Sequence, residues 1–262
     1  MQALLALGRT VVRHHHVLTN FVLRDLKVKY RGTVLGYLWS LLEPLSLVLI
    51  YWFVFVVIAR RGGPDYPLVV ILGVLPFQFF NTVVSSGAAS LTANASLIRR
   101  VWLPRELFVV ATALSSLVVL GLSLLVCLPF LLLYQVPIGP RLVGLPAGLA
   151  LLSAFATGLA LALAAPSAIY RDLGYVLRVL LRLGFYASPV IYSIDMVPAS
   201  IQGWYLLNPL AVYLTAIRSA VMNQPVGFSF VAWLWGASLA VLSLLAGAHL
   251  FRRYEAQAVK FL

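Results

Sequence analysis

Charged residues are rare in six long apolar stretches of this chain, and that distribution decides its fold class. The stretches run over residues 34–58, 67–93, 107–134, 142–165, 173–194 and 228–251. Each is long enough to cross a hydrocarbon core of about 30 Å as a helix that rises about 1.5 Å per residue. The composition, 62% hydrophobic and 10% charged, agrees with this. The sequence therefore predicts an all-α integral membrane protein in which residues 1–262 form one domain of six transmembrane helices.

The positions of the basic residues choose the orientation of these helices. With the N-terminus in the cytosol, fifteen of the 19 Lys and Arg residues lie on the cytosolic side. The other side then holds Arg60, Arg61, Arg141 and Arg218. By the positive-inside rule, both ends of the chain are predicted to be cytosolic. The net charge of +12 follows from this topology and from attraction to anionic lipid, which disfavours nucleic acid as a partner.

Residues 20–31 are typical of an amphipathic helix at the cytosolic interface. At about 100° per residue, Val22 and Leu26 fall on an apolar arc, while Arg24 and Lys27 fall on a basic one. Such a helix lies in the headgroup plane with its basic face on anionic lipid. A merely solvated helix is the alternative.

The segment between the second and third apolar stretches combines apolar side chains with charge. Asn94 or Ser96 can cap a short helix, and Pro104 ends it. The result is a predicted helix over 97–103 that presents Trp102 on the cytosolic side, which favours a docking surface. A connecting loop is the alternative.

Prolines interrupt the segment between the fifth and sixth stretches. Its two apolar pieces, 199–207 and 210–222, are each too short to cross a bilayer. Short apolar segments of this kind are typical of re-entrant helices, which at membrane depth must face protein or water. The sequence predicts a re-entrant helical hairpin over 199–222 that serves as an outer gate.

Residues that would support other functions are missing. None of the seven Asp and Glu residues lies at the centre of a span, which disfavours a proton- or sodium-coupled carrier. No DxD, DxxD, GxSxG, HExxH or CxxC motif occurs, which disfavours a metal site and a membrane-embedded enzyme of glycan assembly. There is no GxxxxGK[ST] loop, so the chain is not expected to hydrolyse ATP on its own. The carrier and the enzyme are kept as the less favoured alternatives.

Four blocks of sequence resemble ABC-2 type permeases of the polysaccharide exporter branch, which serve O-antigen, teichoic acid, capsule and mycobacterial galactan. The blocks, in chain order, are LRDLKVKYRGTVLGYLWSLLEPL (23–45), LIRRVWLPRE (97–106), YRDLGYVLRVLLRLGFYASPVIY (170–192) and NPLAVYLTAIR (208–218). Each block is loose alone, but the four in order, together with six spans, are specific. An ABC-2 permease for a drug or a lipid is the alternative within this resemblance.

The resemblance implies a non-enzymatic transport subunit of the bacterial cytoplasmic (inner) membrane. It implies a homodimer docked on a separate ATPase subunit, which binds ATP and Mg. The implied docking residues are Leu97, Ile98, Arg99, Arg100, Val101 and Trp102, with Arg171 and Asp172 as a second contact. It also implies a channel at the dimer interface for a polyprenyl-pyrophosphate-linked glycan. Aromatic candidates for its wall are Tyr37, Trp39, Tyr51, Trp52, Phe77 and Phe80, for each of which a core or lipid-facing position is the alternative.

One face of the fifth span carries a strip of basic residues. Arg171, Arg178 and Arg182 recur on it together with Tyr175. A charge inside an apolar span is costly unless it faces water, a partner or a ligand. Two interpretations stay open: the side chains snorkel to anionic headgroups, or they receive the pyrophosphate of the lipid-linked glycan through bidentate contacts.

Overall fold

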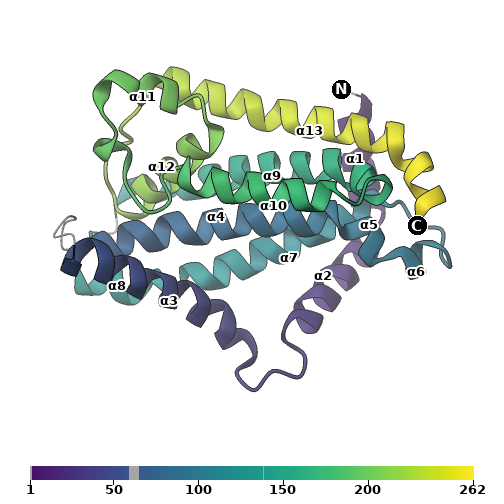
Figure 1. Ribbon diagram of the computed structural model, residues 1–262, viewed down its shortest axis with the longest axis horizontal. Helices are drawn as coiled ribbons and strands as arrows, with labels where there is room; N and C mark the ends of the chain where they lie inside the picture. The colour runs from purple at the N-terminus through teal and green to yellow at the C-terminus, as the bar shows by residue number, and fades with distance from the viewer. Residues whose placement is uncertain (1, 59–64, 138) are drawn as a thin grey trace.

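The computed structural model describes residues 2–58, 65–137 and 139–262, and every regular element in these ranges is helical (Figure 1). This confirms the all-α class. The main helices are α1 (Gln2–Arg13), α2 (His15–Tyr30), α3 (Trp39–Trp52), α4 (Tyr66–Ala88), α7 (Glu106–Leu124), α8 (Cys127–Leu133), α9 (Gly144–Ile169), α10 (Leu173–Tyr186), α12 (Pro209–Val221) and α13 (Phe230–Ala258). The short helices are α5 (Ser90–Ala93), α6 (Ala95–Ile98) and α11 (Ala199–Tyr205). A π-helix, η2 (Phe53–Ile58), extends α3, and 3₁₀ turns occupy η1 (Gly36–Leu38), η3 (Pro140–Val143), η4 (Ile194–Met196) and η5 (Val259–Phe261).

Four helical stretches among the described residues are long and apolar enough to cross a membrane. They are Tyr66–Ala88, Glu106–Leu133, Pro140–Ile169 and Phe230–Phe261. They correspond to the second, third, fourth and sixth predicted spans, so the chain is a multi-pass helical membrane protein. The total of six spans stays a prediction.

The first and fifth predicted spans are shorter as helices than the apolar stretches suggest. α3 begins at Trp39 instead of residue 34, because Gly32 and Gly36 adopt positive φ angles of 75° and 50° that no right-handed helix contains. α10 ends at Tyr186, so its helix is only about 21 Å long, less than the hydrocarbon thickness of about 30 Å. Pro189 prevents its continuation, because proline clashes with the preceding helical turn. The remainder of the predicted span 173–194 is irregular.

The core forms around α9, which packs lengthwise against α13 on one side and α4 on the other. Small residues allow the first of these contacts. A Cβ atom added at Gly158 would collide with the Ser243–Leu244 backbone, and one added at Gly247 would collide with the Gly158 carbonyl. Backbones that approach this closely gain van der Waals contact, which is the main force joining helices in lipid. At this crossing the backbones of α9 and α13 therefore touch directly.

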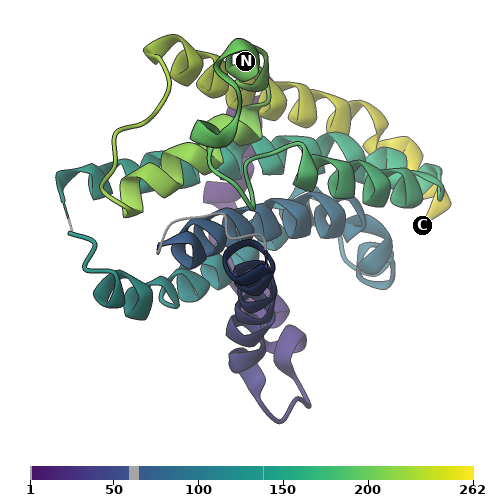
Figure 2. The ribbon, with the colours of Figure 1, turned by 60° about the vertical axis from the view of Figure 1, so that its left-hand side comes forward.

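The N-terminal region contains more helix than the predicted segment 20–31. α2 starts at His15, and α1 precedes it along the end of α13. α2 contacts the bundle through Leu18 and Phe21, whose ring stacks on Phe108 of α7 at 5.0 Å. This buried face lies about one turn before the predicted apolar arc of Val22 and Leu26. The loop that leads from α2 to α3 lies away from the bundle (Figure 2).

Candidate functional site

The predicted helix over 97–103 is only partly helical. α6 ends at Ile98, and a further hydrogen bond from the Val101 amide to the Leu97 carbonyl (3.0 Å) closes one last turn before Pro104. Leu97 and Ile98 pack half-buried against the Phe21–Phe108 cluster. Arg99 and Arg100 are exposed, as is Val101, and the Trp102 side chain is 89% exposed. Half of this segment is thus anchored to α2 and α7, and half faces away from the protein.

Two ion pairs join Arg105 and Glu106, at the start of α7, to the C-terminal end of α13. The Arg105 guanidinium donates to the Glu255 carboxylate at 2.8 Å, and Arg252 donates to Glu106 at 3.4 Å. Glu106 is only 7% exposed, and a carboxylate buried to that extent requires a partner. The start of α7 is therefore bound to the end of the chain by two oppositely directed charge pairs.

Arg171 and Asp172, the predicted second contact, are exposed in the turn between α9 and α10. Figure 1 places this turn at the same end of the molecule as α6 and both termini. Arg178 and Arg182 are exposed on α10, and the Arg178 guanidinium lies 4.5 Å from the centre of the Tyr175 ring. None of the three arginines forms an ion pair with another described residue. The strip predicted on this helix therefore faces outward from the single chain.

The predicted channel aromatics separate into buried and exposed groups. Phe77 is 3% exposed and Phe80 is 5% exposed, since they belong to a chain of ring contacts through the core that includes Phe185 and Phe155. Within one protomer these two rings are packing residues, and they are not part of a surface that a channel could use. Trp39 and Trp52 are 50% and 39% exposed, and Tyr51 is half-buried against Phe185. The side chain of Tyr37 lies outside the described part of the chain, as do Arg60 and Arg61.

The sequence assigns Arg218 only to the non-cytosolic side, with no partner. Its side chain is 4% exposed and lies inside the bundle. Its guanidinium donates to the carbonyls of Pro189 (2.8 Å), Val190 (3.3 Å), Tyr192 (3.1 Å) and Val69 (3.2 Å). Pro189, Val190 and Tyr192 follow the end of α10, where the backbone has no helical partners, whereas Val69 lies in the first turn of α4. Arg218 therefore supplies the donors that this irregular segment needs and ties it to α4.

Neighbouring side chains complete the same segment. The Tyr66 hydroxyl donates to the Ile191 carbonyl at 2.7 Å, and the Asn208 amide donates to the Ala187 carbonyl at 3.1 Å. Gly73 permits the close approach, because a Cβ there would collide with the Val190 carbonyl. We call residues 187–192 with their donors Tyr66, Asn208 and Arg218 the arginine cap. Sequence reasoning missed it, although a lone arginine in the apolar block 208–218 was a signal for a buried donor.

Through Arg218, the arginine cap joins residues 187–192 to α12 of the predicted outer segment. α11 (Ala199–Tyr205) and α12 (Pro209–Val221) match the two predicted pieces closely, and they lie at the opposite end of the molecule from α6 (Figure 1). α12 is buried from Leu210 to Ala220 among α4, α9 and α13. A cavity of about 210 Å³ lies beside Arg218 and is lined by Asp65, Asp195 and Thr215, among others.

These features define a class: a multi-pass helical membrane protein with an aromatic and basic surface at one end and a buried helical cap at the other. Comparison with known proteins identifies the family. The model of the ABC-2 type transporter family matches residues 17–222. The chain belongs to this family.

Named relatives align with nearly the whole chain. The O-antigen export system permease protein RfbA of Klebsiella pneumoniae is 30% identical over 235 residues, which covers 87% of this chain and 88% of the relative. The protein of the same name from Myxococcus xanthus is 29% identical over 222 residues, covering 82% and 84%. The polysialic acid transport protein KpsM of Escherichia coli is 24% identical over 240 residues, covering 89% and 91%.

Proposed function

We propose that this chain is the transmembrane subunit of an ATP-driven exporter that moves a lipid-linked polysaccharide across the bacterial cytoplasmic membrane. The observation that carries the proposal is the end-to-end similarity to permeases that export O-antigen or transport polysialic acid. Two copies form a channel at their interface, and Trp39 and Trp52, which are exposed in one protomer, supply part of its wall. Aromatic faces suit this role because they contact the C–H groups of sugar rings.

A separate ATPase subunit supplies the energy by docking at the cytosolic corner. The chain offers this subunit two exposed contacts at the same end of the molecule. They are the exposed half of segment 97–103 and the turn at Arg171 and Asp172. ATP and Mg bind to that subunit. The two ion pairs to α13 hold the corner in place, so that movement of the ATPase is passed to the membrane helices.

The function is tested with this chain co-expressed with its ATPase subunit and reconstituted in lipid nanodiscs. We expect ATP hydrolysis to rise on addition of a polyprenyl-pyrophosphate-linked glycan and to stay at its basal rate with the free glycan. Stimulation by an amphipathic drug, with no response to the lipid-linked glycan, would contradict the proposal and identify a permease for a different cargo.

The outer location of the α11–α12 segment is tested by labelling from outside the cell. Met196→Cys and Gln224→Cys, both at exposed positions, are made singly in a Cys127→Ser background. If the segment enters and leaves the membrane on one side, both variants react with an impermeant thiol reagent. Arg99→Cys is the cytosolic control and stays unlabelled in intact cells. Reaction of only one of the two outer cysteines means that residues 199–222 cross the membrane.

Arg178 and Arg182 bind the pyrophosphate of the cargo at the cytosolic mouth of the channel. Both are exposed and form no ion pair with another residue that the structure describes, which leaves their guanidinium groups available. Lysine keeps the charge but loses the bidentate fork. We expect the double variant Arg178→Lys and Arg182→Lys to need at least about tenfold more lipid-linked glycan for half-maximal ATPase stimulation, with basal hydrolysis preserved.

A matched control separates this role from general effects of the exchange. Arg253 on α13 is also exposed, and its guanidinium lies 5.8 Å from the centre of a tyrosine ring, that of Tyr254. Arg253→Lys leaves the glycan response unchanged. If the double Lys variant responds as the wild type does, its arginines snorkel to headgroups instead.

A further inference from the structure

The cavity of about 210 Å³ beside Arg218 combines a buried polar floor with an exposed polar mouth. It lies between the start of α4, η4 and the end of α12, and we call it the outer cavity. On its floor, Thr215 and Arg218 are 5% and 4% exposed, whereas Asp195 and Gln224 at its mouth are exposed. At about 30 Å³ per water molecule, it has room for about seven waters or for one small polar ring.

The outer cavity contains hydrogen-bond acceptors that the protein does not match. The carboxylates of Asp65 and Asp195 both line it. Among the residues that the structure describes, neither carboxylate accepts a hydrogen bond or forms an ion pair. A carboxylate can only accept, and its hydrogen bonds to O–H or N–H donors are stronger than those between neutral groups. A ligand that supplies donors therefore suits this cavity.

The floor of the outer cavity adds two groups with unused capacity. The Thr215 hydroxyl is buried and has no hydrogen-bond partner within the described part of the chain. Buried hydroxyl groups are almost always hydrogen-bonded. The Arg218 guanidinium has five N–H groups and uses four of them on the backbone carbonyls named above, so one remains. A ligand for this floor must both donate and accept, as a hydroxyl group does.

The mixture of charges argues against an ion as the ligand. Two carboxylates repel an anion, and the fixed guanidinium of Arg218 repels a metal ion. In the described ranges of the chain, no group of three or more His, Cys, Asp or Glu side chains could hold a metal. A neutral molecule rich in hydroxyls meets no such conflict, and Ile194, Met196 and Met222 offer apolar surface to its C–H groups. A monosaccharide ring with adjacent hydroxyls has this chemistry and this size.

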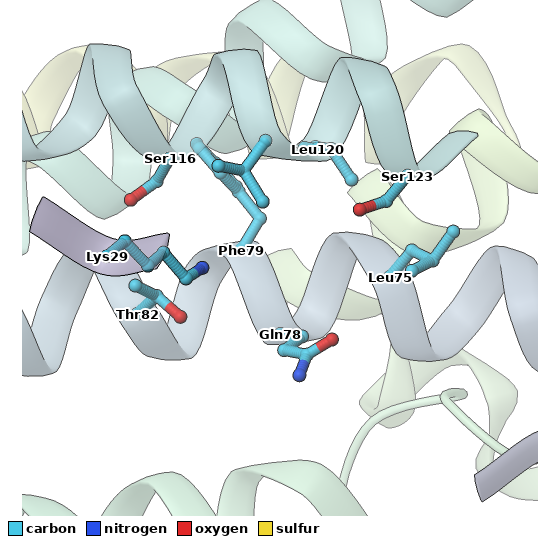
Figure 3. A pocket seen from close by; sticks show the side chains of 9 residues that line it. Lys29, Leu75, Gln78, Phe79, Thr82, Ser116, Leu120 and Ser123 are labelled. Carbon is cyan, nitrogen blue, oxygen red and sulfur yellow. The ribbon is translucent and has the colours of Figure 1, made fainter. Parts of the chain in front are cut away.

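The cavity between α4 and α7 lacks this combination (Figure 3). Its volume is about 270 Å³, and Gln78, Thr82 and Ser116 supply polar groups to its lining. None of the described residues that line it carries a carboxylate. The Lys29 ammonium at its edge already has an interaction partner in the protein. This cavity therefore offers no unmatched charge and serves as a control site.

We propose that the outer cavity is a saccharide site, which holds one neutral sugar unit of the exported glycan on the outer side of the membrane. Asp65 and Asp195 accept from adjacent hydroxyls of the sugar, and Thr215 bonds to a further hydroxyl on the floor. A sugar unit held there resists movement of the polysaccharide back into the membrane between rounds of ATP hydrolysis. This inference rests on the proposed function and adds an outer binding site to the pyrophosphate strip on α10.

Sugar binding is measured on the full-length chain in nanodiscs by saturation-transfer difference NMR. The probes are free galactose, mannose and rhamnose, with tetrahydropyran as a ring of similar shape that has no hydroxyls. We expect at least one sugar to bind with a Kd on the order of 1 mM, as suits a small ligand held by a few hydrogen bonds. Tetrahydropyran should not bind. An absence of binding by all three sugars, or equal binding of tetrahydropyran, would overturn the assignment.

A substitution at the mouth of the outer cavity locates the bound sugar. Asp195→Asn should weaken sugar binding about tenfold, because a neutral amide replaces a charged acceptor. Since Asp195 is exposed, the thermal midpoint should stay unchanged. Asp25→Asn, the same exchange on α2 outside the cavity, should leave the sugar affinity as it is. Equal sugar affinities in these two variants would contradict the site.

A substitution on the floor gives a second, independent test. Thr215→Val replaces an unpartnered buried hydroxyl by a methyl group, so the thermal midpoint should stay or rise while sugar binding weakens. Thr82→Val makes the same exchange in the cavity of Figure 3 and should not change the sugar affinity. If Thr82→Val weakens binding and Thr215→Val does not, the sugar occupies the cavity between α4 and α7, and the outer cavity is not the site.

Assays of the complete complex with its ATPase separate this site from the proposed function. Asp195→Asn should slow export of the lipid-linked glycan. Unchanged export in a variant that has lost sugar binding would assign the outer cavity to a free sugar and overturn its link to the cargo. If the wild-type complex responds to the lipid-linked glycan but binds no free sugar, the saccharide site is wrong and the proposed function stands. Sugar binding without any response to the lipid-linked glycan would instead contradict the proposed function.

Discussion

Arg218→Met is expected to destabilise the purified chain more than any other exchange of a single basic residue. The Arg218 guanidinium donates to four backbone carbonyls, three of which lie in the irregular segment after α10, and a buried carbonyl left without a donor costs about 1–3 kcal/mol. The free energy of unfolding should therefore fall by at least about 3 kcal/mol, which appears as a lower thermal midpoint in detergent. The thermal midpoint of Arg218→Lys should lie between those of the wild type and Arg218→Met, because one ammonium group cannot reach all four acceptors.

Arg141→Met is the matched control for this experiment. Arg141 is exposed and makes one hydrogen bond, to the Asn223 carbonyl at 2.9 Å, near the same end of the molecule. Its loss should change the thermal midpoint little, since an exposed carbonyl bonds to water instead. Identical midpoints for Arg141→Met and Arg218→Met would show that the arginine cap does not stabilise the fold.

Trp102→Ala is expected to stop export without affecting folding. The side chain is 89% exposed in the isolated chain, so its removal leaves no cavity and the thermal midpoint stays unchanged. A large exposed aromatic is typical of the residues that dominate an interface, and its truncation commonly costs 2 kcal/mol or more, equivalent to roughly a thirtyfold loss of affinity. Export of the lipid-linked glycan and co-purification of the ATPase subunit should both fall.

Trp204→Ala controls for the loss of an exposed tryptophan. Trp204 lies in α11 at the opposite end of the molecule and is 77% exposed. The proposed docking surface does not include it, so ATPase binding should be retained in this variant. Normal co-purification of the ATPase with Trp102→Ala would remove segment 97–103 from the docking surface, whatever the effect on export.

Elements whose boundaries depend on nearby residues were predicted well. Pro198 stands directly before α11 and Pro209 is the first residue of α12, and both short helices begin where these prolines predicted. The four long apolar stretches are long helices because an apolar composition over that length is itself a local signal. The late start of α3 was missed, since it depends on two glycines with positive φ that the apolar pattern ignored.

Contacts between distant segments could not be predicted in this way. Arg218 and Val69 are 149 residues apart, and Arg105 and Glu255 are 150 residues apart. Hydropathy assigns each of these charges to a side of the membrane but not to a partner. Likewise, Phe77 and Phe80 were interpreted as wall residues because composition does not distinguish an inward ring from an outward one.

The backbone contact between Gly158 and Gly247 also limits how this protein can move. Two helices that touch without intervening side chains cannot slide or rotate past each other unless they first separate, so α9 and α13 behave as one rigid body. α12 is buried against both and moves with them. We therefore expect conformational change during a transport cycle to involve the peripheral elements: α3, which joins the bundle mainly along α4, and α10, whose outer face is exposed. Gly32 and Gly36 before α3, and the irregular segment after Tyr186, are the positions at which we expect these two helices to swing.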